Sequence, residues 1–336
     1  MISIIIPTFN REKYLIRALA SLGAQNFSPD KFEILILDNN STDGTKTASE
    51  KFIARNNRHQ IRYILETEPG LLSGRHRGAL EAQGDILIFI DDDIEADVNW
   101  LQALADSFTD TTVQLVGGRN LPKYEIEPPK WIEWFWCPHP YGRFCGYLSL
   151  LDFGSEIREI SANYVWGLNF SIRKKALFEL GGFHPDCLPS HLQHFQGDGE
   201  TGLTRQANKL GYRAIYQPRA LVFHHITKER LTPEYFEKRF FYQGICDSYT
   251  QIRESQGKLN KKNLQERVKA ALLGLKDTLL IASGRIKLSE KQKLHRKFNK
   301  AYRKGYEFHQ SAVRNNPKLL EWVLKKDYWD YTLPQL

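Results

Sequence analysis

The chain has 336 residues, of which 41% are hydrophobic and 26% are charged, and its formal net charge is +8 at pH 7. This length suits one large domain with an appendage, or two modest domains, and the composition is that of an ordinary globular protein. No apolar run approaches the roughly 18–20 residues that a membrane-spanning helix needs, and the apolar start lacks the basic leader of a signal peptide.

Charge is distributed unevenly along the chain. Residues 1–225 hold 23 Lys and Arg against 27 Asp and Glu, whereas residues 226–336 hold 24 against 12. This split predicts a catalytic body and a basic tail with a different partner, although a solvated helical surface explains the tail equally well. A cytoplasmic protein with reduced thiols is expected, because no metal-like spacing and no CxxC occurs among Cys137, Cys145, Cys187 and Cys246.

The first part of the chain alternates between two patterns. Short runs of apolar, β-branched residues predict strands at 2–8, 32–40, 61–67 and 85–91. Segments with helix-like patterns lie between them, at 11–25, 41–56 and 71–84. Such alternation predicts a mostly parallel sheet flanked by helices, with ligands beyond the carboxyl ends of the strands. We therefore expect one crevice to be lined by the residues at those ends, namely Pro7, Thr8, Asp38, Asn39 and Asp91–Asp93.

The alternation breaks at 118–165, where prolines interrupt a segment rich in Trp and other aromatic residues. We do not expect regular structure there. A loop that covers a site is the favoured interpretation, and an unusual aromatic core patch is the alternative. From residue 233 the pattern is helical and basic, with candidate helices at 233–255, 262–283 and 289–313. The expected organisation is a main domain at 1–230, divided near 117 into two halves, and a basic helical extension at 231–336.

Three adjacent carboxylates, Asp91, Asp92 and Asp93, follow the last of these strands directly. An Asp-x-Asp pair at a strand end can bind Mg²⁺ or Mn²⁺, hard ions that prefer oxygen ligands and leave positions open for phosphate oxygens. A helix-capping role is the alternative, but capping needs one Asp. No GxGxxG follows the first strand and no GxxxxGK[ST] occurs, so a divalent ion and Arg75 are the candidates for neutralising nucleotide phosphates.

Five ordered blocks carry a resemblance to a known family. They are "SIIIPTFNREKYLIRALASLGAQ", "FEILILDNNSTDGT", "EPGLLSGRHRGALEAQGDILIFIDDD", "GLNFSIRKKALFELGGF" and "GDGETGLTRQANKLGYRAIYQPRALVFHH". Over about residues 1–245 the chain resembles the family 2 glycosyltransferases, which are inverting enzymes with the GT-A fold. The resemblance implies a Rossmann-like α/β fold with a mixed, mostly parallel sheet. It also implies a nucleotide-diphosphate sugar donor (most often a UDP-sugar), a saccharide or lipid-linked hydroxyl acceptor, and Mn²⁺ or Mg²⁺.

The resemblance also implies roles for individual residues. Contacts with the nucleotide sugar fall on Pro7, Thr8, Asn10, Asp38, Arg75, Asp91 and Asp92. Asp43 is a less certain member of the second loop, and His76 stands where the family usually has Asn after the arginine. The metal ligands would be Asp93, Asp91 and His224. Of the three aspartates, we expect Asp92 to tolerate substitution best.

An inverting displacement needs one base to remove the acceptor hydroxyl proton. Counting back from "GY" at 211–212 assigns the base to Glu200, whereas matching by the leading glycine assigns it to Asp198. A helix-terminal acid favoured by the helix dipole is the structural alternative for Glu200. Trp166 is a candidate for stacking on an acceptor sugar and His194 for an acceptor-side position, and a purely structural role is the alternative for each.

Two further hypotheses concern partners and function class. The segment 264–283 has an apolar face that suits core packing or an interfacial helix on an anionic membrane, at the cytoplasmic side. Nucleic-acid binding is disfavoured, because no nucleic-acid motif accompanies the basic charge. A sugar-nucleotide nucleotidyltransferase and a non-catalytic sugar-nucleotide-binding scaffold remain the alternatives to a glycosyltransferase.

Overall fold

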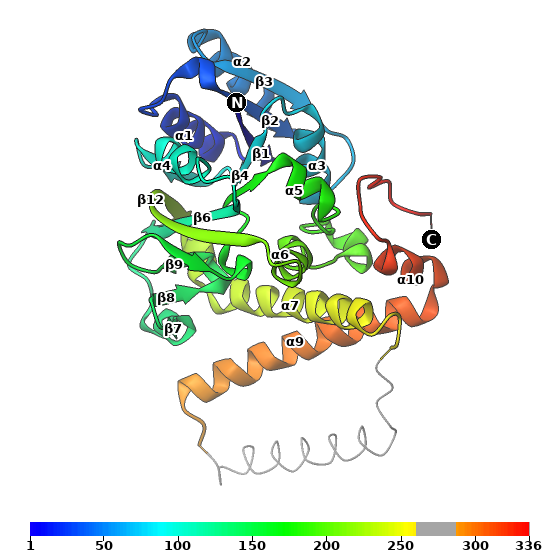
Figure 1. Cartoon of the computed structure of the whole chain (residues 1–336). Coiled ribbons are helices and arrows are strands. Elements are labelled where there is room, and N and C mark those ends of the chain that lie inside the picture. Colours follow the sequence, from blue (N-terminus) through cyan, green and yellow to red (C-terminus); the bar gives the residue numbers. More distant parts are fainter. Residues whose placement is uncertain (260–286, 336) are drawn as a thin grey trace. The chain divides into compact units, whose positions relative to one another are not determined.

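The computed structural model describes residues 1–259 and 287–335, so the helix predicted at 262–283 lies outside the described residues. The described chain falls into two compact units (Figure 1). The first, which we call the catalytic unit, comprises residues 1–231 together with 325–335. The second, the helical unit, comprises the described part of 232–324.

A parallel sheet forms the start of the catalytic unit. Its spatial order is β3-β2-β1-β4, formed by β1 (Ile2–Thr8), β2 (Phe32–Asp38), β3 (Gln60–Leu65) and β4 (Ile86–Ile90). The connecting helices are α1 (Glu12–Gly23), α2 (Thr45–Arg55) and α3 (Leu71–Glu81). Thr8 pairs with Asp38 in register, so the carboxyl ends of the strands share one edge. The predicted strand-helix alternation is confirmed over residues 1–90.

The sheet continues beyond β4 with mixed strand directions. β11 (Asn169–Arg173) runs antiparallel to both β4 and β6 (Val113–Tyr124), and β12 (Arg213–Ile226) runs parallel to β6. The shorter strands are β5 (Ile94–Ala96), β7 (Cys137–His139), β8 (Gly142–Cys145), β9 (Leu150–Asp152) and β10 (Arg158–Ile160). The remaining helices of this unit are α4 (Trp100–Ser107), α5 (Lys174–Glu179) and α6 (Glu200–Lys209).

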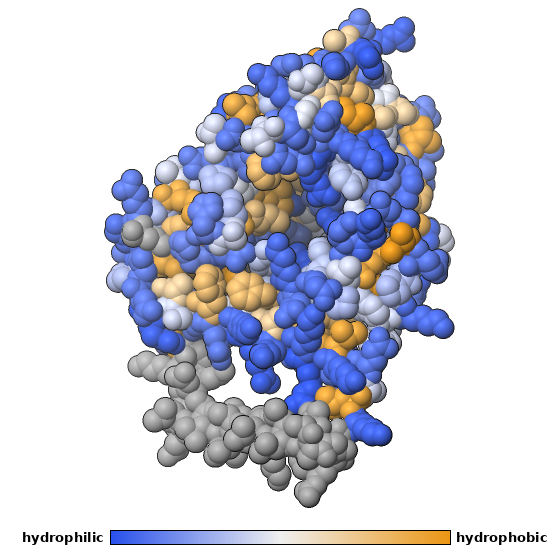
Figure 2. All heavy atoms as spheres, turned by 180° about the vertical axis from the view of Figure 1, so that it is seen from behind, coloured by the Kyte–Doolittle hydropathy of each residue, from blue (hydrophilic) through white to orange (hydrophobic). Residues whose placement is uncertain are grey.

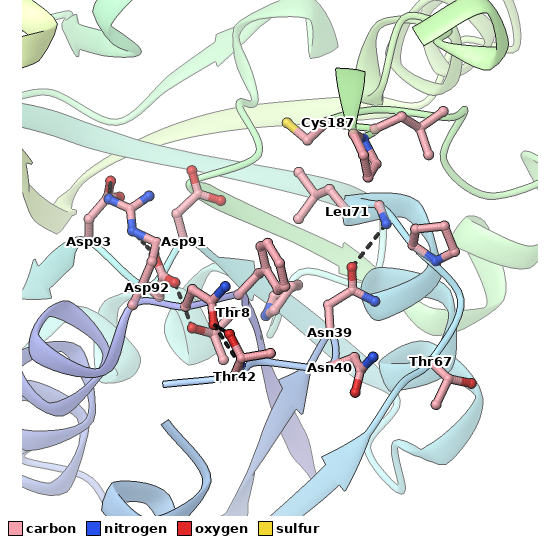
Figure 3. A pocket seen from close by; sticks show the side chains of 18 of the residues that line it. Thr8, Asn39, Asn40, Thr42, Thr67, Leu71, Asp91, Asp92, Asp93 and Cys187 are labelled. Atoms are coloured by element: carbon pink, nitrogen blue, oxygen red, sulfur yellow. Dashed lines mark hydrogen bonds and ion pairs between the residues drawn. The ribbon is translucent and has the colours of Figure 1, made fainter. Parts of the chain in front are cut away.

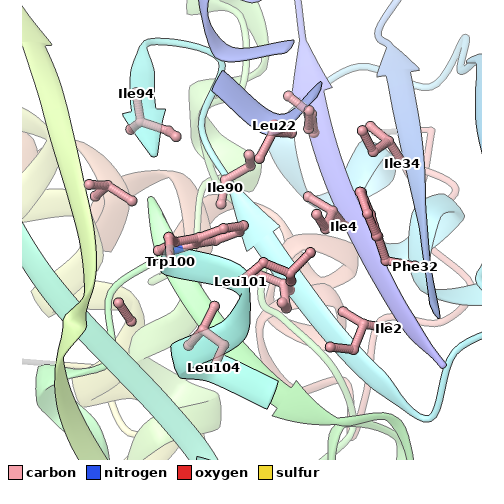
Figure 4. Close-up of a cluster of buried hydrophobic side chains, with 14 of the residues drawn as sticks. Ile2, Ile4, Leu22, Phe32, Ile34, Ile90, Ile94, Trp100, Leu101 and Leu104 are labelled. Atoms are coloured by element: carbon pink, nitrogen blue, oxygen red, sulfur yellow. The ribbon is translucent and has the colours of Figure 1, made fainter. Parts of the chain in front are cut away.

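The main core lies between one face of the sheet and helices α1 and α4 (Figure 4). Helix α1 buries Leu15, Leu19 and Leu22, which recur at helical spacing. The indole of Trp100 is fully buried, and its Nε1 donates a hydrogen bond to Oδ1 of Asn169 at 3.0 Å. Each fully buried Leu or Ile side chain contributes about 1.5–3 kcal/mol relative to exposure. This packing holds the strand ends that carry the candidate site in fixed positions.

The segment 118–165 departs from its prediction. It contains the end of β6, four of the short strands and three 3₁₀ turns, at Lys130–Phe135, Gly146–Leu148 and Ala162–Tyr164, so the expectation of no regular structure is wrong. Three of its aromatic residues, Trp131, Phe135 and Phe153, are buried, and most of the others are partly buried. The Phe153 ring stacks on His139 with centroids 4.2 Å apart. An aromatic core patch therefore accounts for much of this composition.

The helical unit consists of α7 (Pro233–Glu254), α9 (Glu290–Asn315) and α10 (Pro317–Leu324) in the described residues. Helices α7 and α9 approach closely where glycine removes the side chain: a Cβ on Gly244 would clash with the Tyr302 carbonyl, and one on Gly305 with that of Phe241. Within the described residues, no helix is long and apolar enough to cross a membrane. Figure 2 shows one mainly hydrophilic face, on which apolar residues form separate patches.

Candidate active site

A cavity of about 730 Å³ lies at the carboxyl ends of β1, β2 and β4, where ligands of open α/β sheets bind. Figure 3 shows Thr8, Asn39 and Asp91–Asp93 around it, carried by the segments that follow the three strands. Segments from elsewhere in the catalytic unit complete the lining with Gly70, Cys187 and Arg230. Of the predicted nucleotide-sugar contacts, the structure brings together here Pro7, Thr8, Asn10, Asp91 and Asp92.

The three aspartates have different surroundings. The Asp91 side chain is 38% exposed, and its Oδ1 lies 3.9 Å from Nη2 of Arg75. Asp92 is buried; its Oδ2 accepts a hydrogen bond from the Thr8 hydroxyl at 2.7 Å, and its Oδ1 lies 3.3 Å from Nε of Arg11. These two contacts give Asp92 a structural task, which argues against the expectation that it tolerates substitution best.

Asp93 is the most strongly paired of the three. Its Oδ2 lies 2.9 Å from Nη2 of Arg11 and 2.9 Å from Nη2 of Arg230. Burial acts to raise its pKa, but His224 when protonated, together with Arg230 and Arg11, outweighs burial and holds the pKa of Asp93 well below its usual range. Burial raises the pKa of Asp92 to about 7, against the charge of Arg11. Asp93 therefore stays ionised over the physiological range and is the carboxylate best suited to bind a cation.

The residues around Asp93 fit a divalent cation. Oδ1 of Asp93 is buried and accepts no hydrogen bond from the described residues, and Nε2 of His224 lies 3.4 Å from it. Because Nδ1 of His224 donates to the Leu148 carbonyl at 2.9 Å, Nε2 carries the lone pair that a metal needs. Within the described ranges no group of three or more His, Cys, Asp or Glu has metal-binding geometry. Phosphate oxygens of a bound ligand and water would therefore have to complete the coordination shell of a cation.

The loop after β1 contains Asn10, which has a left-handed backbone with φ of 55°. Its Oδ1 accepts a hydrogen bond from the Thr42 N–H at 2.7 Å, and its own N–H donates to Oγ of Ser41 at 2.8 Å. Asn and Asp adopt this conformation more readily than other non-glycine residues. Asn10 thus ties the loop after β1 to the loop after β2, which carries Asp43.

Asp38 is not part of the cavity lining. Its Oδ1 accepts from the Ser41 N–H at 2.9 Å and its Oδ2 from the Tyr63 hydroxyl at 2.6 Å, and the residue is 1% exposed. The following residues, Asn39 and Asn40, reach the lining instead. Asp38 therefore holds the loop after β2 through Ser41 and does not itself face the cavity.

Arg75 links the aspartate cluster to the candidate base. Its guanidinium is buried, with Nη1 3.3 Å from Oε2 of Glu200 and Nη2 3.9 Å from Oδ1 of Asp91. Glu200 is the first residue of α6, where the helix dipole favours a carboxylate, and Oε1 accepts from the Gly167 N–H at 3.1 Å. The Glu200 side chain is 26% exposed, so an acceptor hydroxyl can reach it.

Asp198, the other candidate base, has a different environment. Its side chain is 4% exposed, and its Oδ1 lies 2.6 Å from Nδ1 of His184. A carboxylate that is buried and paired with a histidine is a less accessible proton acceptor than Glu200. The geometry favours Glu200 as the base and assigns Asp198 to orienting the loop before α6.

The predicted acceptor residues do not line the cavity. Trp166 is partly buried, donates from Nε1 to the Asn163 carbonyl at 2.9 Å, and meets Phe144 edge-on at 6.0 Å. His194 lies in the 3₁₀ turn Ser190–Phe195, with its ring 4.3 Å from that of Phe195. Pro189, directly before this turn, does reach the cavity, together with Cys187 and Leu188.

Sequence reasoning missed the two arginines on Asp93. Arg11 stands in the first resemblance block and could have been found from its place after the first strand, next to Asn10. Arg230 lies in a basic stretch with several similar residues, and nothing in the sequence distinguishes it from its neighbours. Both residues became visible only when folding brought them to one carboxylate.

The chain is similar to known proteins in sequence. The sequence model of "Glycosyl transferase family 2" matches residues 3–174. Glycosyltransferase AglE of Haloferax volcanii is 32% identical over 217 residues, which cover 64% of this chain and 64% of AglE, slightly less than two thirds of that relative. A glucosyl-dolichyl phosphate glucuronosyltransferase of the same organism is 23% identical over 248 residues, covering 72% of this chain and 75% of that protein.

Solved structures share the fold. A Pyrobaculum calidifontis mannosyltransferase, solved with GDP-Man and Mn²⁺, superposes with a TM-score of 0.55 at 19% identity, covering 98% of this chain and 88% of that one. S. aureus TarS 1–349, solved with UDP-GlcNAc, gives 0.50 at 18% identity and covers 94% and 91%. The predicted GT-A fold is thereby confirmed. With a family match over half of its length, the chain belongs to glycosyl transferase family 2.

Proposed function

We propose that this protein is an inverting glycosyltransferase that moves a sugar from a nucleoside-diphosphate donor to a hydroxyl of a saccharide or lipid-linked acceptor, with the help of a divalent cation. The observation that carries the proposal is the position of Arg75, which joins Glu200 to Asp91, a residue that lines the cavity. A nucleotide-binding scaffold has no need for a partly exposed carboxylate at that place. A nucleotidyltransferase would require a glycine-rich loop after β1, and "PTFNREKY" has no glycine.

The donor would lie in the cavity with its nucleotide over the loops after β1 and β2. Asp93, Asp91 and His224 are the residues that would hold Mn²⁺ or Mg²⁺, which stabilises the departing diphosphate when bound. Arg11 and Arg230, already beside Asp93, add positive charge at the same edge. The complexes of the structural neighbours, one with GDP-Man and Mn²⁺ and one with UDP-GlcNAc, support a donor of this class.

The transfer would proceed by one displacement. The acceptor oxygen attacks the anomeric carbon from the side opposite the diphosphate, its proton passes to a carboxylate oxygen of Glu200, and the bond from the anomeric carbon to the diphosphate breaks. The ion pair with Arg75 and the hydrogen bond from Gly167 hold the Glu200 carboxylate in one orientation. General-base catalysis of this kind contributes on the order of 10²–10⁴ in rate.

A lipid-linked acceptor agrees with a basic surface on the helical unit. Helix α9 buries Phe298, Ala301 and Gly305 on one face. Its exposed residues include Lys293, Lys300 and Lys304. Anionic lipids of the cytoplasmic leaflet attract such residues by about 1 kcal/mol each. The name of one relative, a glucosyl-dolichyl phosphate glucuronosyltransferase, supports an acceptor of this kind.

Two measurements test the proposal. A panel of nucleotide sugars, with Mn²⁺, Mg²⁺ or EDTA, should yield nucleoside diphosphate from a preferred donor only with metal, whereas pyrophosphate formation from a nucleotide triphosphate and sugar phosphate would indicate the nucleotidyltransferase. Sedimentation with anionic liposomes at low and moderate salt tests membrane contact. Binding should fall when Lys293, Lys300 and Lys304 are changed to Gln, but not in a control with Lys13, Lys46 and Lys51 changed to Gln.

A further inference from the structure

The end of the chain returns to the catalytic unit as residues 325–335. Within it, Tyr328 is fully buried. Trp329 stacks on His76, with centroids 4.2 Å apart and planes at 24°, and on Phe178, with centroids 4.1 Å apart and planes at 5°. We call residues 327–331 the C-terminal strap. Its side chains are fixed in the catalytic unit by aromatic packing at these positions.

His76, in α3, connects the strap with the segment around Phe183. The imidazole is fully buried, and its Nδ1 lies 2.9 Å from the Tyr328 carbonyl, so Nδ1 carries the proton. The Nε2 atom is then an acceptor, and it receives the Phe183 N–H at 2.9 Å. A Cβ on Gly182 would clash with the same ring, so only glycine allows this approach. Both ring nitrogens are therefore used to bind two distant segments to α3.

These contacts lead directly to the residues of the proposed reaction. Arg75 precedes His76 in α3, and its guanidinium lies over the Phe183 ring, 4.9 Å from the centroid. His184, which follows Phe183, receives the Tyr328 ring edge-on at 5.5 Å, and its N–H donates to the Gly199 carbonyl at 2.9 Å. The strap thus supports Arg75 on one side and the segment before Glu200 on the other.

A separate contact connects the strap with the wall of the cavity. The Tyr331 hydroxyl donates to Oε2 of Glu66 at 2.8 Å, and Oε1 of the same carboxylate accepts the Glu68 N–H at 2.8 Å. Thr67, between these two residues, lines the cavity. The Glu66 side chain therefore transmits the position of Tyr331 to the segment that follows β3.

We propose that the C-terminal strap is a positioning element of the active site. Tyr328 and Trp329 act through His76 and fix the positions of Arg75 and Glu200, the arginine and the base of the transfer. Tyr331 acts through Glu66 and fixes the position of the cavity wall that receives the donor. The proposal rests on the proposed function for its kinetic consequence, but not for the physical coupling. It assigns a role to His76 and to residues at the far end of the chain.

The test compares five variants of the full-length protein with the parent. Trp329→Ala and His76→Asn should lower kcat by about 10- to 100-fold, because displacement of reacting groups by about 1 Å has effects of this size. Tyr331→Phe should raise the donor KM several-fold and leave kcat within about twofold. Trp329→Phe, which keeps an aromatic ring in the stack, should restore most of the turnover lost in Trp329→Ala. Tyr212→Phe is the matched control, since it also removes a single tyrosine hydrogen bond to a glutamate, from Tyr212 to Glu179 at 2.6 Å, and it should leave both constants unchanged.

Hydrogen exchange separates this inference from the proposed function. In Trp329→Ala, amides of residues 70–76 and 183–200 should exchange at least about tenfold faster, while those of β1 and β2 keep their protection. This result would support the coupling even if no donor is ever turned over. Unchanged exchange in both segments, or unchanged kcat in an active Trp329→Ala enzyme of normal thermal midpoint, overturns the inference. If Trp329→Ala does not fold, the donor KM of Tyr331→Phe, compared with that of Tyr212→Phe, decides the inference.

Discussion

Arg230 holds Asp93 and His224 at the same time. One guanidinium nitrogen, Nη2, lies 2.9 Å from Oδ2 of Asp93, and the other, Nη1, lies 2.6 Å from Nε2 of His224. Both partners are residues that the family resemblance assigns to a metal. A cation bound through Nε2 of His224 therefore has to displace Arg230 from that nitrogen.

This competition gives the first prediction. Arg230→Ala should bind Mn²⁺ more tightly than the parent in the absence of donor, by several-fold, because Nε2 of His224 no longer has to exchange an arginine for the metal. Titration calorimetry with Mn²⁺ alone measures the difference. Arg119→Ala, which breaks an ion pair to Asp152 at 2.7 Å, is the control and should show no change. Equal Mn²⁺ affinity in Arg230→Ala and the parent would argue that the metal does not use His224.

The second prediction concerns Asp92. Asp92→Ala should lower the free energy of unfolding by about 1–3 kcal/mol, since the buried Thr8 hydroxyl loses its acceptor and Arg11 loses one of its carboxylates. Urea unfolding of the two proteins at neutral pH measures this. Asp30→Ala removes an exposed carboxylate and should have little effect. A fully stable Asp92→Ala protein would restore the expectation that this position tolerates change.

The third prediction separates the two candidate bases. Glu200→Gln should keep donor affinity within about threefold and lower kcat by about 10²–10⁴, because the amide cannot accept the acceptor proton. Asp198→Asn should have a smaller effect, through the His184 contact. Donor affinity by calorimetry and turnover by nucleotide release provide both numbers. Transfer that survives in Glu200→Gln and disappears in Asp198→Asn would show that Asp198 is the base.

The fourth prediction follows from the neutral state of His76. Burial lowers the pKa of His76 to about 3, whereas an unfolded histidine has a pKa of about 6.5. Below pH 6.5 the His76 imidazole binds a proton in the unfolded chain but not in the folded protein. The stability associated with His76 is therefore complete above pH 6.5 and falls as the pH drops towards 3, by about 1.4 kcal/mol per unit.

Urea unfolding of the parent and His76→Asn at pH 7, 6 and 5 measures this contribution, since the titrating groups that both proteins share cancel in the difference. The parent should lose more stability than the variant between pH 6 and pH 5. Parallel losses in the two proteins would mean that His76 is protonated in the folded state.

The local patterns of the sequence determined the first half of the fold. Runs such as "ISIIIPT" and "FEILILD" are mostly apolar and rich in Ile and Leu, and they are fully buried as strands covered on both faces. The helices between them follow from apolar residues at a period of 3.6, as in α1. The place of the cavity followed too, because parallel strands bring their carboxyl ends, with Thr8 and Asp91–Asp93, to one edge. The same local reasoning failed at 118–165, where an aromatic segment without clear periodicity turned out to contain short strands held by distant partners.

Only the tertiary structure decided which groups share a contact. Asp38 and Asp93 carry the same side chain and lie at the carboxyl ends of two strands of one parallel sheet. Yet Asp38 binds Ser41 and Tyr63, whereas Asp93 meets Arg11 and Arg230. The strap contacts of His76 join residues separated by 252 positions. No local pattern encodes such pairs, because ion pairs and buried hydrogen bonds depend on distances of a few ångströms, which packing of the whole catalytic unit sets. The sequence by itself determined the chemical types available at the site, and the fold decided their partners, their burial and hence their charge.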